Sequence, residues 1–392
     1  NPAVNTTALE VCNGLDDDCD GTIDAGPCIA NAHCEGEGAN IGYVCDDGYE
    51  LINGVCEWLG WGSQSLHPMA AGQRHTCGLR AGRLYCWGAS QSGALGLPVF
   101  VGNIEVPTRV GTDHDWLWID SARNHTCGVR GGELYCWGDN GYGQLGTGDT
   151  QPVRAPVMVG DATTWEMVAA GGRHTCGIDD GELYCWGQGY DGQLGLGYTG
   201  METDPQLVVG PTGRWVDVSA SINELTCGIT DNNGARTLYC WGRGGGSDNY
   251  GEALGNCNDD YRYLSPVEVG SRCGQENGLP ALWTDVDAGG RFACAINDGA
   301  LFCWGRNAWG QIGDGNPGMD VDAPVQIGTA NDWVWISAGK ASVCGIREDM
   351  VGDRRMYCWG KADYGILGVG TDVTGLPHCY WYDGGEGAAF IC

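Results

Sequence analysis

The stretch HTCGIDDGELYCWGQGYDGQLGLG, residues 174–197, contains two cysteines nine positions apart, and Trp-Gly follows the second. Writing Cys176 opposite Cys185 leaves Asp180 and Gly181 as a two-residue loop. Asp-Gly between alternating residues indicates a tight β-hairpin, because a type I′ turn needs a positive φ at both central positions. Facing positions of a hairpin lie within disulfide distance. The stretch therefore predicts a β-hairpin closed by a disulfide.

This unit recurs along the chain about every 50 residues, with one longer interval. Close copies begin at His75 and His125, and looser copies begin at Leu225, Phe292 and Ser342. A fixed period in this range indicates stacked supersecondary units such as propeller blades. The same alignment predicts six disulfides: Cys77–Cys86, Cys127–Cys136, Cys176–Cys185, Cys227–Cys240, Cys294–Cys303 and Cys344–Cys358.

Each repeat contains two further strand patterns. One is a short element such as PVMVG at 156–160 or PVEVG at 266–270, and proline suits the start of an edge strand. The other begins with Trp, as in WEMVAAG at 165–171 and WTDVDAG at 283–289. Four short strands in such a unit make one propeller blade. The predicted fold class is therefore all-β, a β-propeller with four-stranded blades.

The whole unit resembles the repeat of the regulator of chromosome condensation family over residues 58–392. The resemblance rests on Trp-Gly with GQLGxG, then PxxVG, then a Trp strand ending in AGxxHTC. Members of that family form seven-bladed propellers, which implies seven blades here. Cys379 and Cys392 have the same spacing of 13 as Cys227 and Cys240 and predict a seventh disulfide hairpin, completed by the strand around Trp58–Gly62. A six-bladed ring with a C-terminal appendage is the alternative.

Composition restricts the partners and the compartment. The net charge is −30 with only two lysines, which argues against nucleic acid or an anionic membrane as partner. An even number of cysteines, 22, fits an oxidising compartment, and no apolar run is long enough to span a membrane. The chain begins at Asn1, as a mature chain would after removal of a signal peptide. We expect a secreted, extracellular or cell-surface protein without membrane insertion. Secreted bacterial members that inhibit β-lactamases share this compartment, whereas the family's founding member is a nuclear exchange factor on chromatin.

The segment before the propeller has a different composition. EVCNGLDDDCDGTID, residues 10–24, places carboxylates at alternate positions before a glycine, as in the first half of a calcium loop. Pro27 stands where a complete EF-hand loop has Glu. The stretch resembles an Asp-rich metal-binding motif of bacterial cell-surface proteins and the calcium repeats of thrombospondins. We predict calcium as the cofactor of residues 1–27, with a solvated acidic loop as the alternative. The predicted ligands are Asp16, Asp18, Asp20, Thr22 and Asp24.

Residues 28–57 form a second small module, rich in cysteine. CDDGYELINGVC, residues 45–56, resembles the end of an EGF-like module, but residues 28–56 contain four cysteines where that family has six. The six cysteines between residues 12 and 56 allow 15 pairings, of which we prefer Cys12–Cys19 and Cys45–Cys56. Disulfides and metal are expected to stabilise this N-terminal part, because it is too small for a large core.

No catalytic motif stands out, and we expect no enzyme. His75, His125 and His174 occur once per blade, which indicates a repeated packing or hydrogen-bonding position. The loop after Trp-Gly contains an aromatic residue in five of the six repeats, and Tyr and Trp are common interface anchors. These rings could alternatively cover their own glycine-rich turns. The candidate partner-binding residues are Tyr142, Tyr190, Tyr250, Trp309 and Tyr364.

A long insertion between Gly242 and Trp283 is the second candidate for function, because long loops on rigid scaffolds often bind partners. Its two cysteines, Cys257 and Cys273, are expected to pair with each other. Together these features predict a surface or structural protein that binds a protein partner or associates with itself. A secreted binder or inhibitor of another extracellular protein is the first alternative, and an enzyme acting in the propeller mouth is the second.

Overall fold

The computed structural model describes residues 69–98, 102–244, 253–257, 262–270 and 281–361, and the backbone of six short strands outside these ranges. The described residues are all-β apart from one short 3-10 turn, η2 (Gln91–Gly93). None of the described residues belongs to a helix long and apolar enough to cross a membrane.

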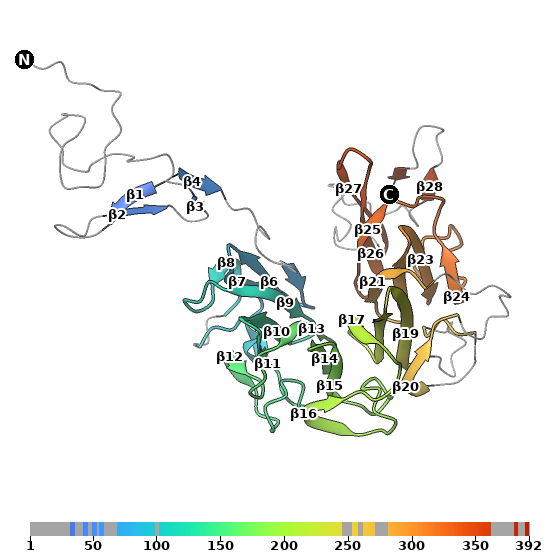
Figure 1. The fold of residues 1–392 in the computed structure, drawn as a ribbon, viewed down its shortest axis with the longest axis horizontal. Helices are drawn as coiled ribbons and strands as arrows, with labels where there is room; N and C mark the ends of the chain where they lie inside the picture. Colours follow the sequence, from blue (N-terminus) through green and yellow to red (C-terminus); the bar gives the residue numbers. More distant parts are fainter. Residues whose placement is uncertain are drawn as a thin grey trace, which may run out of the picture.

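Six consecutive antiparallel sheets follow one another around an arc (Figure 1), and each sheet is one blade. Blade 1 comprises β5 (Met69–Ala71), β6 (His75–Arg80), β7 (Arg83–Gly88) and β8 (Ile104–Arg109). Blade 2 comprises β9 (Trp116–Ser121), β10 (His125–Arg130), β11 (Glu133–Gly138) and β12 (Val153–Met158). Blade 3 comprises β13 (Trp165–Ala170), β14 (His174–Asp179), β15 (Glu182–Gln188) and β16 (Met201–Leu207).

The second half of the arc repeats this order. Blade 4 comprises β17 (Arg214–Ala220), β18 (Leu225–Asn232), β19 (Ala235–Arg243) and β20 (Arg262–Glu268). Blade 5 comprises β21 (Trp283–Ala288), β22 (Phe292–Asn297), β23 (Ala300–Gly305) and β24 (Val321–Gln326). Blade 6 has three described strands, β25 (Trp333–Ala338), β26 (Ser342–Glu348) and β27 (Arg354–Gly360). The fold is thus an all-β, six-bladed propeller, and six is the blade number that the sequence left open as its alternative.

The central hairpin of each blade has the register that the cysteine spacing predicts. In blade 3, Cys176 faces Cys185, and Asp180 and Gly181 form the tip with φ values of 46° and 78°. All six predicted pairs are joined, with Cα–Cα distances of 4.1 Å: Cys77–Cys86, Cys127–Cys136, Cys176–Cys185, Cys227–Cys240, Cys294–Cys303 and Cys344–Cys358. In blade 3 the residue after the first cysteine packs closely on the Trp strand, because a Cβ on Gly177 would lie 2.8 Å from Cζ3 of Trp165, whereas blade 5 accommodates Ala295 at this position.

The strands at the two edges of a blade differ in environment. The proline-containing strand, such as β12 with Pro156, lies at one edge of the sheet, where a missing N–H does not break a ladder. The Trp strand lies at the opposite edge, and hydrogen bonds link it to the Trp strand of the next blade. We call the Trp strands the inner strands.

The N- and C-terminal parts contain short hairpins. β1 (Ala32–Glu35) pairs with β2 (Gly42–Cys45), and β3 (Tyr49–Ile52) pairs with β4 (Val55–Trp58). Trp58, expected in the strand that completes a seventh blade, therefore pairs with Tyr49 of β3. The expected C-terminal hairpin forms from β28 (Tyr380–Tyr382) and β29 (Ala389–Ile391). Residues 59–68, Cys379 and Cys392 lie outside the described residues.

Candidate functional site

The loop after Trp-Gly is fixed from within by a buried asparagine in blades 2 and 5. In blade 2, Oδ1 of Asn140 accepts the N–H of Leu145 at 2.9 Å, and Nδ2 donates to the carbonyl of Asp149 at 3.1 Å. Asn307 makes the same two kinds of contact in blade 5. Both asparagines are fully buried. The loop is therefore a rigid element, although glycine is abundant in it.

A glutamine in the same loop connects it to the next blade. The side-chain Oε1 of Gln144 accepts the N–H of Tyr142 at 2.8 Å. The backbone carbonyl of Gln144 accepts the indole N–H of Trp186 at 3.0 Å and the hydroxyl of Thr175 at 2.7 Å. Gln311 holds the backbone of Trp309 in the same way, at 2.8 Å. The backbone of each aromatic residue is thus fixed, while its side chain lies outside this network.

The candidate partner-binding side chains have different environments. Tyr190 is 50% exposed and Trp309 is 44% exposed, and Nζ of Lys361 lies 4.7 Å from the Trp309 ring centre. Tyr142 is half-buried, with the guanidinium of Arg173 at 4.7 Å from its ring. Tyr142 is therefore partly covered by an arginine of the next blade, whereas Tyr190 and Trp309 present aromatic surface to solvent. Tyr250 and Tyr364 lie outside the described residues.

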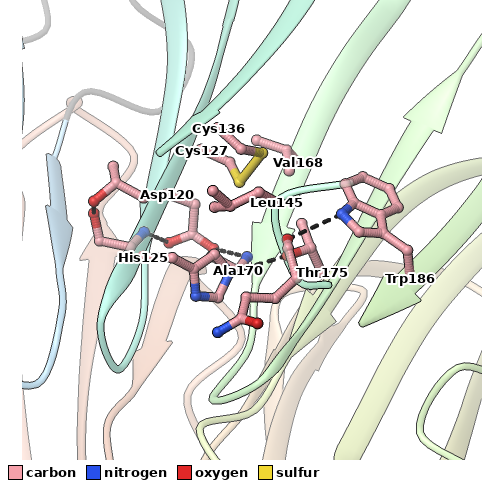
Figure 2. The surroundings of a disulfide bond; sticks show 12 residues. Asp120, His125, Cys127, Cys136, Leu145, Val168, Ala170, Thr175 and Trp186 are labelled. Carbon is pink, nitrogen blue, oxygen red and sulfur yellow. Dashed lines mark hydrogen bonds between the residues drawn. A yellow bond between two sulfur atoms is a disulfide. The ribbon is translucent and has the colours of Figure 1, made fainter. Parts of the chain in front are cut away.

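The three histidines connect neighbouring blades, as the hydrogen-bonding hypothesis expects. Figure 2 shows His125 of blade 2 beside Thr175 of blade 3. The threonine hydroxyl donates to a carbonyl, so its oxygen accepts the N–H of the histidine Nε2. The three Nε2–Oγ1 distances are 2.8 Å for His75–Thr126, 2.9 Å for His125–Thr175 and 2.9 Å for His174–Thr226.

Burial keeps these histidines neutral. It lowers the pKa of His75 to about 4 and the pKa of His125 and His174 to about 3. Among the described residues, Nδ1 of His125 and Nδ1 of His174 are buried without a hydrogen-bond partner. Protonation there would create a buried N–H without an acceptor, so the rings are structural at neutral pH.

Carboxylates of the inner strands form a second set of links, which the sequence analysis missed. Each accepts a backbone N–H from the inner strand of the next blade, as Asp120 does from Ala170 in Figure 2. The oxygen–nitrogen distances are 2.8 Å for Asp120–Ala170, 3.1 Å for Asp217–Val286, 2.8 Å for Asp285–Ile336 and 2.7 Å for Asp287–Ala338. Burial, and then the charges of Asp285 and Asp287, raise the pKa of Asp217 well above its usual range.

Apolar and polar residues alternate along the Trp strands and point to these carboxylates, but a β-bulge obscures the pattern. In β17 the register shifts between Trp215 and Asp217, so that Trp215 and Val218 are both buried in the core between blades. Asp217 and Ser219 are left to face the inner strand of blade 5. A bulge adds one residue to a strand and reverses the alternation beyond it.

The sequence predicts a metal site in residues 1–27. Its ligands, Asp16, Asp18, Asp20, Thr22 and Asp24, lie outside the described residues. In the part of the chain that the structure describes, no group of three or more His, Cys, Asp or Glu side chains could hold a metal ion. Cys257 is disulfide-bonded, and Cys273 lies outside the described residues.

Comparisons with protein families identify two sequence motifs. The regulator of chromosome condensation repeat matches residues 81–129, 131–178, 180–223 and 298–346. Residues 1–25 match a metal-binding motif family whose name refers to copper binding in MopE. The chain therefore carries regulator of chromosome condensation repeats and, before them, a metal-binding motif.

Two curated relatives match a short part of the chain. The Ultraviolet-B receptor UVR8 of Arabidopsis thaliana is 32% identical over 93 residues, which is 23% of this chain and 20% of the receptor. A bifunctional serine/threonine-protein kinase/NEDD4-like E3 ubiquitin-protein ligase of Dictyostelium discoideum is 32% identical over 102 residues, 23% of this chain and 5% of that protein. The matches thus span a fifth or less of these relatives.

Two solved structures share the fold. Human WBSCR16 has a TM-score of 0.64 at 20% identity, covering 86% of each chain. Yeast RCC1 (Prp20), solved bound to Kap60, has a TM-score of 0.61 at 18% identity, covering 77% of this chain and 71% of that one. At such identities the likeness concerns the fold alone.

Proposed function

We propose that this chain, a propeller of regulator of chromosome condensation repeats, is an extracellular or cell-surface protein that binds other proteins and catalyses no reaction. The observation that carries the proposal is the pair of exposed aromatic side chains, Tyr190 and Trp309, on loops that hydrogen bonds make rigid. Rigid aromatic groups lose little conformational entropy on binding and are frequent interface anchors. The yeast structure bound to Kap60 is a precedent for a protein partner.

The disulfides support the extracellular location. One lies in the central hairpin of every blade, and five of the six have both cysteines fully buried. Cytosolic thiols are kept reduced, so a fold that depends on so many disulfides is suited to an oxidising compartment.

Affinity capture with the purified chain, followed by binding measurements on each recovered protein, tests whether Tyr190 and Trp309 form the binding surface. Trp309→Ala and Tyr190→Ala should each weaken binding of the true partner by ten- to a hundredfold. Trp335→Ala is the matched control, because Trp335 is also exposed, at 36%, but lies on an inner strand. Equal binding by all three variants would contradict the proposed surface.

A secreted inhibitor would use the same two aromatic side chains. It would differ from a structural protein in the stoichiometry of the complex and in its effect on the partner's activity. A single partner enzyme, bound one to one and blocked in its activity, would favour inhibition. Partners without catalytic activity, or multivalent binding, would favour a structural role. Turnover of glycans or peptides by the purified chain would instead favour an enzyme acting in the propeller mouth.

We further propose that calcium is the metal of the N-terminal motif. Residues 1–27 contain no His or Met, and their cysteines are expected to be oxidised, which leaves carboxylate, hydroxyl and carbonyl oxygens. Such hard ligands suit calcium, whereas copper prefers imidazole, thiolate or thioether groups. Calorimetric titration should show calcium uptake that Asp16→Asn with Asp20→Asn abolishes. Copper uptake without calcium uptake would favour the metal in the family name.

A further inference from the structure

Two connections of each blade lie at the same end of its sheet: the turn between the inner strand and the second strand, and the loop after Trp-Gly. A backbone hydrogen bond joins the two connections. In blade 3, the N–H of Gln188 donates to the carbonyl of Arg173 at 2.8 Å. The other five donor–acceptor pairs, at 2.7 to 2.9 Å, are Ala89–Arg74, Asp139–Asn124, Arg243–Glu224, Arg306–Arg291 and Lys361–Ala341. We call this end the turn end, and the opposite end, with the hairpin tip, the tip end.

Cationic residues gather at the turn end. Each blade contributes three positions there, namely the two residues before the second strand and the residue after Trp-Gly. Over the six blades these positions hold eight of the 20 lysines and arginines but only two of the 50 acidic residues, Asp139 and Glu224. The positions therefore carry a net positive charge in a chain of net charge −30. The eight cations are Arg74, Arg123, Arg173, Arg243, Arg291, Arg306, Lys340 and Lys361.

The tip end neutralises its cations within the chain. Arg214 of blade 4 lies 3.3 Å from Asp180 at the tip of blade 3, and Arg236 lies 3.1 Å from Asp231 in the hairpin of blade 4. Four more arginines at this end pair with carboxylates in the same manner: Arg130, Arg347, Arg354 and Arg355.

The cations of the turn end have a different environment. Arg74, Arg123 and Lys340 are exposed, and none of the three forms an ion pair within the described part of the chain. Arg173 and Lys361 lie over the rings of the aromatic loop residues, each at 4.7 Å from the ring centre. A cation over a ring keeps its charge, so the positive positions border the aromatic surface.

Several carboxylates near the turn end bind groups of the propeller itself. Asp120 and Asp287, close to the ends of their inner strands, accept backbone N–H groups of the next blade. Asp149 and Asp314 accept hydrogen bonds from the buried asparagines of their own loops. These four side chains therefore stabilise the blade boundaries and the loops, and the exposed cations remain available to an external carboxylate.

The geometry points to an acidic partner: we propose that the turn end docks an acidic segment of another protein, whose carboxylates pair with the exposed cations beside Tyr190 and Trp309. This inference rests on the proposed function, because it names the class of protein that the two aromatic side chains bind. Complementary charges steer association and fix the register of a complex. Charges further apart than about 10 Å are screened at 0.1 M salt, so a short segment confined to the turn end responds mainly to its cations. A long nucleic acid would also face the acidic remainder of the chain.

Fluorescence anisotropy with a labelled peptide of ten glutamates tests the proposal on the whole chain. Arg123→Glu and Lys340→Glu should each weaken binding about tenfold, and an increase in salt from about 0.05 M to about 0.5 M should weaken it at least tenfold. Arg109→Glu is the matched control, because Arg109 is also exposed but lies at the tip end of blade 1, opposite Tyr85. It changes the net charge equally and should leave binding unchanged. Thermal unfolding of each variant checks that the fold is intact.

Three results would overturn the proposal. The first is no measurable binding of the peptide, and the second is equal weakening by all three charge reversals, which would mean that net charge alone governs binding. The third is tighter binding of a ten-nucleotide single-stranded DNA than of the peptide.

Proteins recovered by affinity capture separate this inference from the proposed function. A loss of binding with both Trp309→Ala and Lys340→Glu supports the two together. A loss with Trp309→Ala alone keeps the proposed function and overturns the acidic partner, whereas a loss with neither contradicts both.

Discussion

The two halves of the arc hold equivalent blades together with different chemistry. From blade 1 to blade 4, each boundary carries a histidine that donates to a threonine of the next blade. At the next two boundaries the same positions hold Leu225 with Ala293 and Phe292 with Val343, all fully buried. At these two boundaries, carboxylates on the inner strands accept backbone N–H groups from the next blade.

This difference shows that a buried polar pair is kept or replaced as a unit. Where the histidine is absent, the facing threonine is also absent, so no hydroxyl is left in an apolar boundary. A buried polar group without its partner costs about 1–3 kcal/mol, whereas replacing both partners with apolar groups is nearly neutral. The two halves should therefore be similarly stable at neutral pH and respond differently to acid.

Acid gives the largest expected effect. The folded-state pKa of each histidine lies below its unfolded value of about 6.5, so the unfolded chain gains protons first as the pH falls. Stability is retained above pH ~6.5 and lost progressively as the pH falls to about 4 for His75 and about 3 for His125 and His174, by about 2 kcal/mol per histidine at pH 5, or roughly 6 kcal/mol for three. Denaturant unfolding at pH 7.5 and 5 measures the loss.

A variant with the chemistry of the second half sharpens this test. Replacing His75, His125 and His174 by Leu, with Thr126, Thr175 and Thr226 by Ala, copies the pair that Leu225 and Ala293 form. Most of the loss of stability between pH 6.5 and pH 5 should disappear. An unchanged pH dependence would show that other groups cause the acid response.

Removal of one disulfide has the next largest effect. Replacing Cys176 and Cys185 by Ala frees a closed loop of about ten residues, for which chain entropy gives roughly 3 kcal/mol. The same change at Cys344 and Cys358 should cost less, because these cysteines are only half-buried and their removal leaves a smaller cavity. Equal losses in the two variants would mean that packing around the buried disulfide contributes little. Thermal unfolding of each variant measures the difference.

Removing one inner-strand carboxylate should cost about 2 kcal/mol. Asp287→Ala leaves the N–H of Ala338 and the hydroxyl of Ser219 without their acceptor. Asp120→Ala is the counterpart in the first half, where Ala170 and Ser121 lose theirs. Denaturant unfolding at pH 7.5 should give similar losses, and a loss only for Asp287→Ala would mean that the His–Thr pairs alone hold the first half.

The smallest effect should be a gain. Because the folded-state pKa of Asp217 is raised, its contribution is favourable at low pH and is lost as the pH rises through that pKa. Asp217→Asn keeps an oxygen for the N–H of Val286 and removes the charge. We expect about 1 kcal/mol of added stability at pH 7.5, shrinking as the pH falls. A loss at pH 7.5 would show that the ionised carboxylate is needed.

The sequence predicted the features that depend on neighbouring residues. Cysteine spacing and the Asp-Gly tips gave the hairpin register, and Pro156 and its counterparts gave the edge strands. The sequence did not predict the inner-strand carboxylates, because the bulge after Trp215 reverses the face on which Asp217 lies. The partial burial of Tyr142 was not predictable for another reason. The guanidinium of Arg173 that lies over its ring comes from the next blade, 31 positions further on, and local patterns do not show such contacts.

The hairpin disulfides have a mechanical consequence. Each one ties residues only 9 to 14 positions apart, so tension along the chain bypasses the segment between the two sulfurs. Under a pulling force a blade can lengthen through its inner and outer strands and its connections, while the closed tip of its central hairpin stays covalently intact. A surface-anchored chain would then yield stepwise, one blade at a time, and each blade would retain a preformed turn from which to fold again when the load is released.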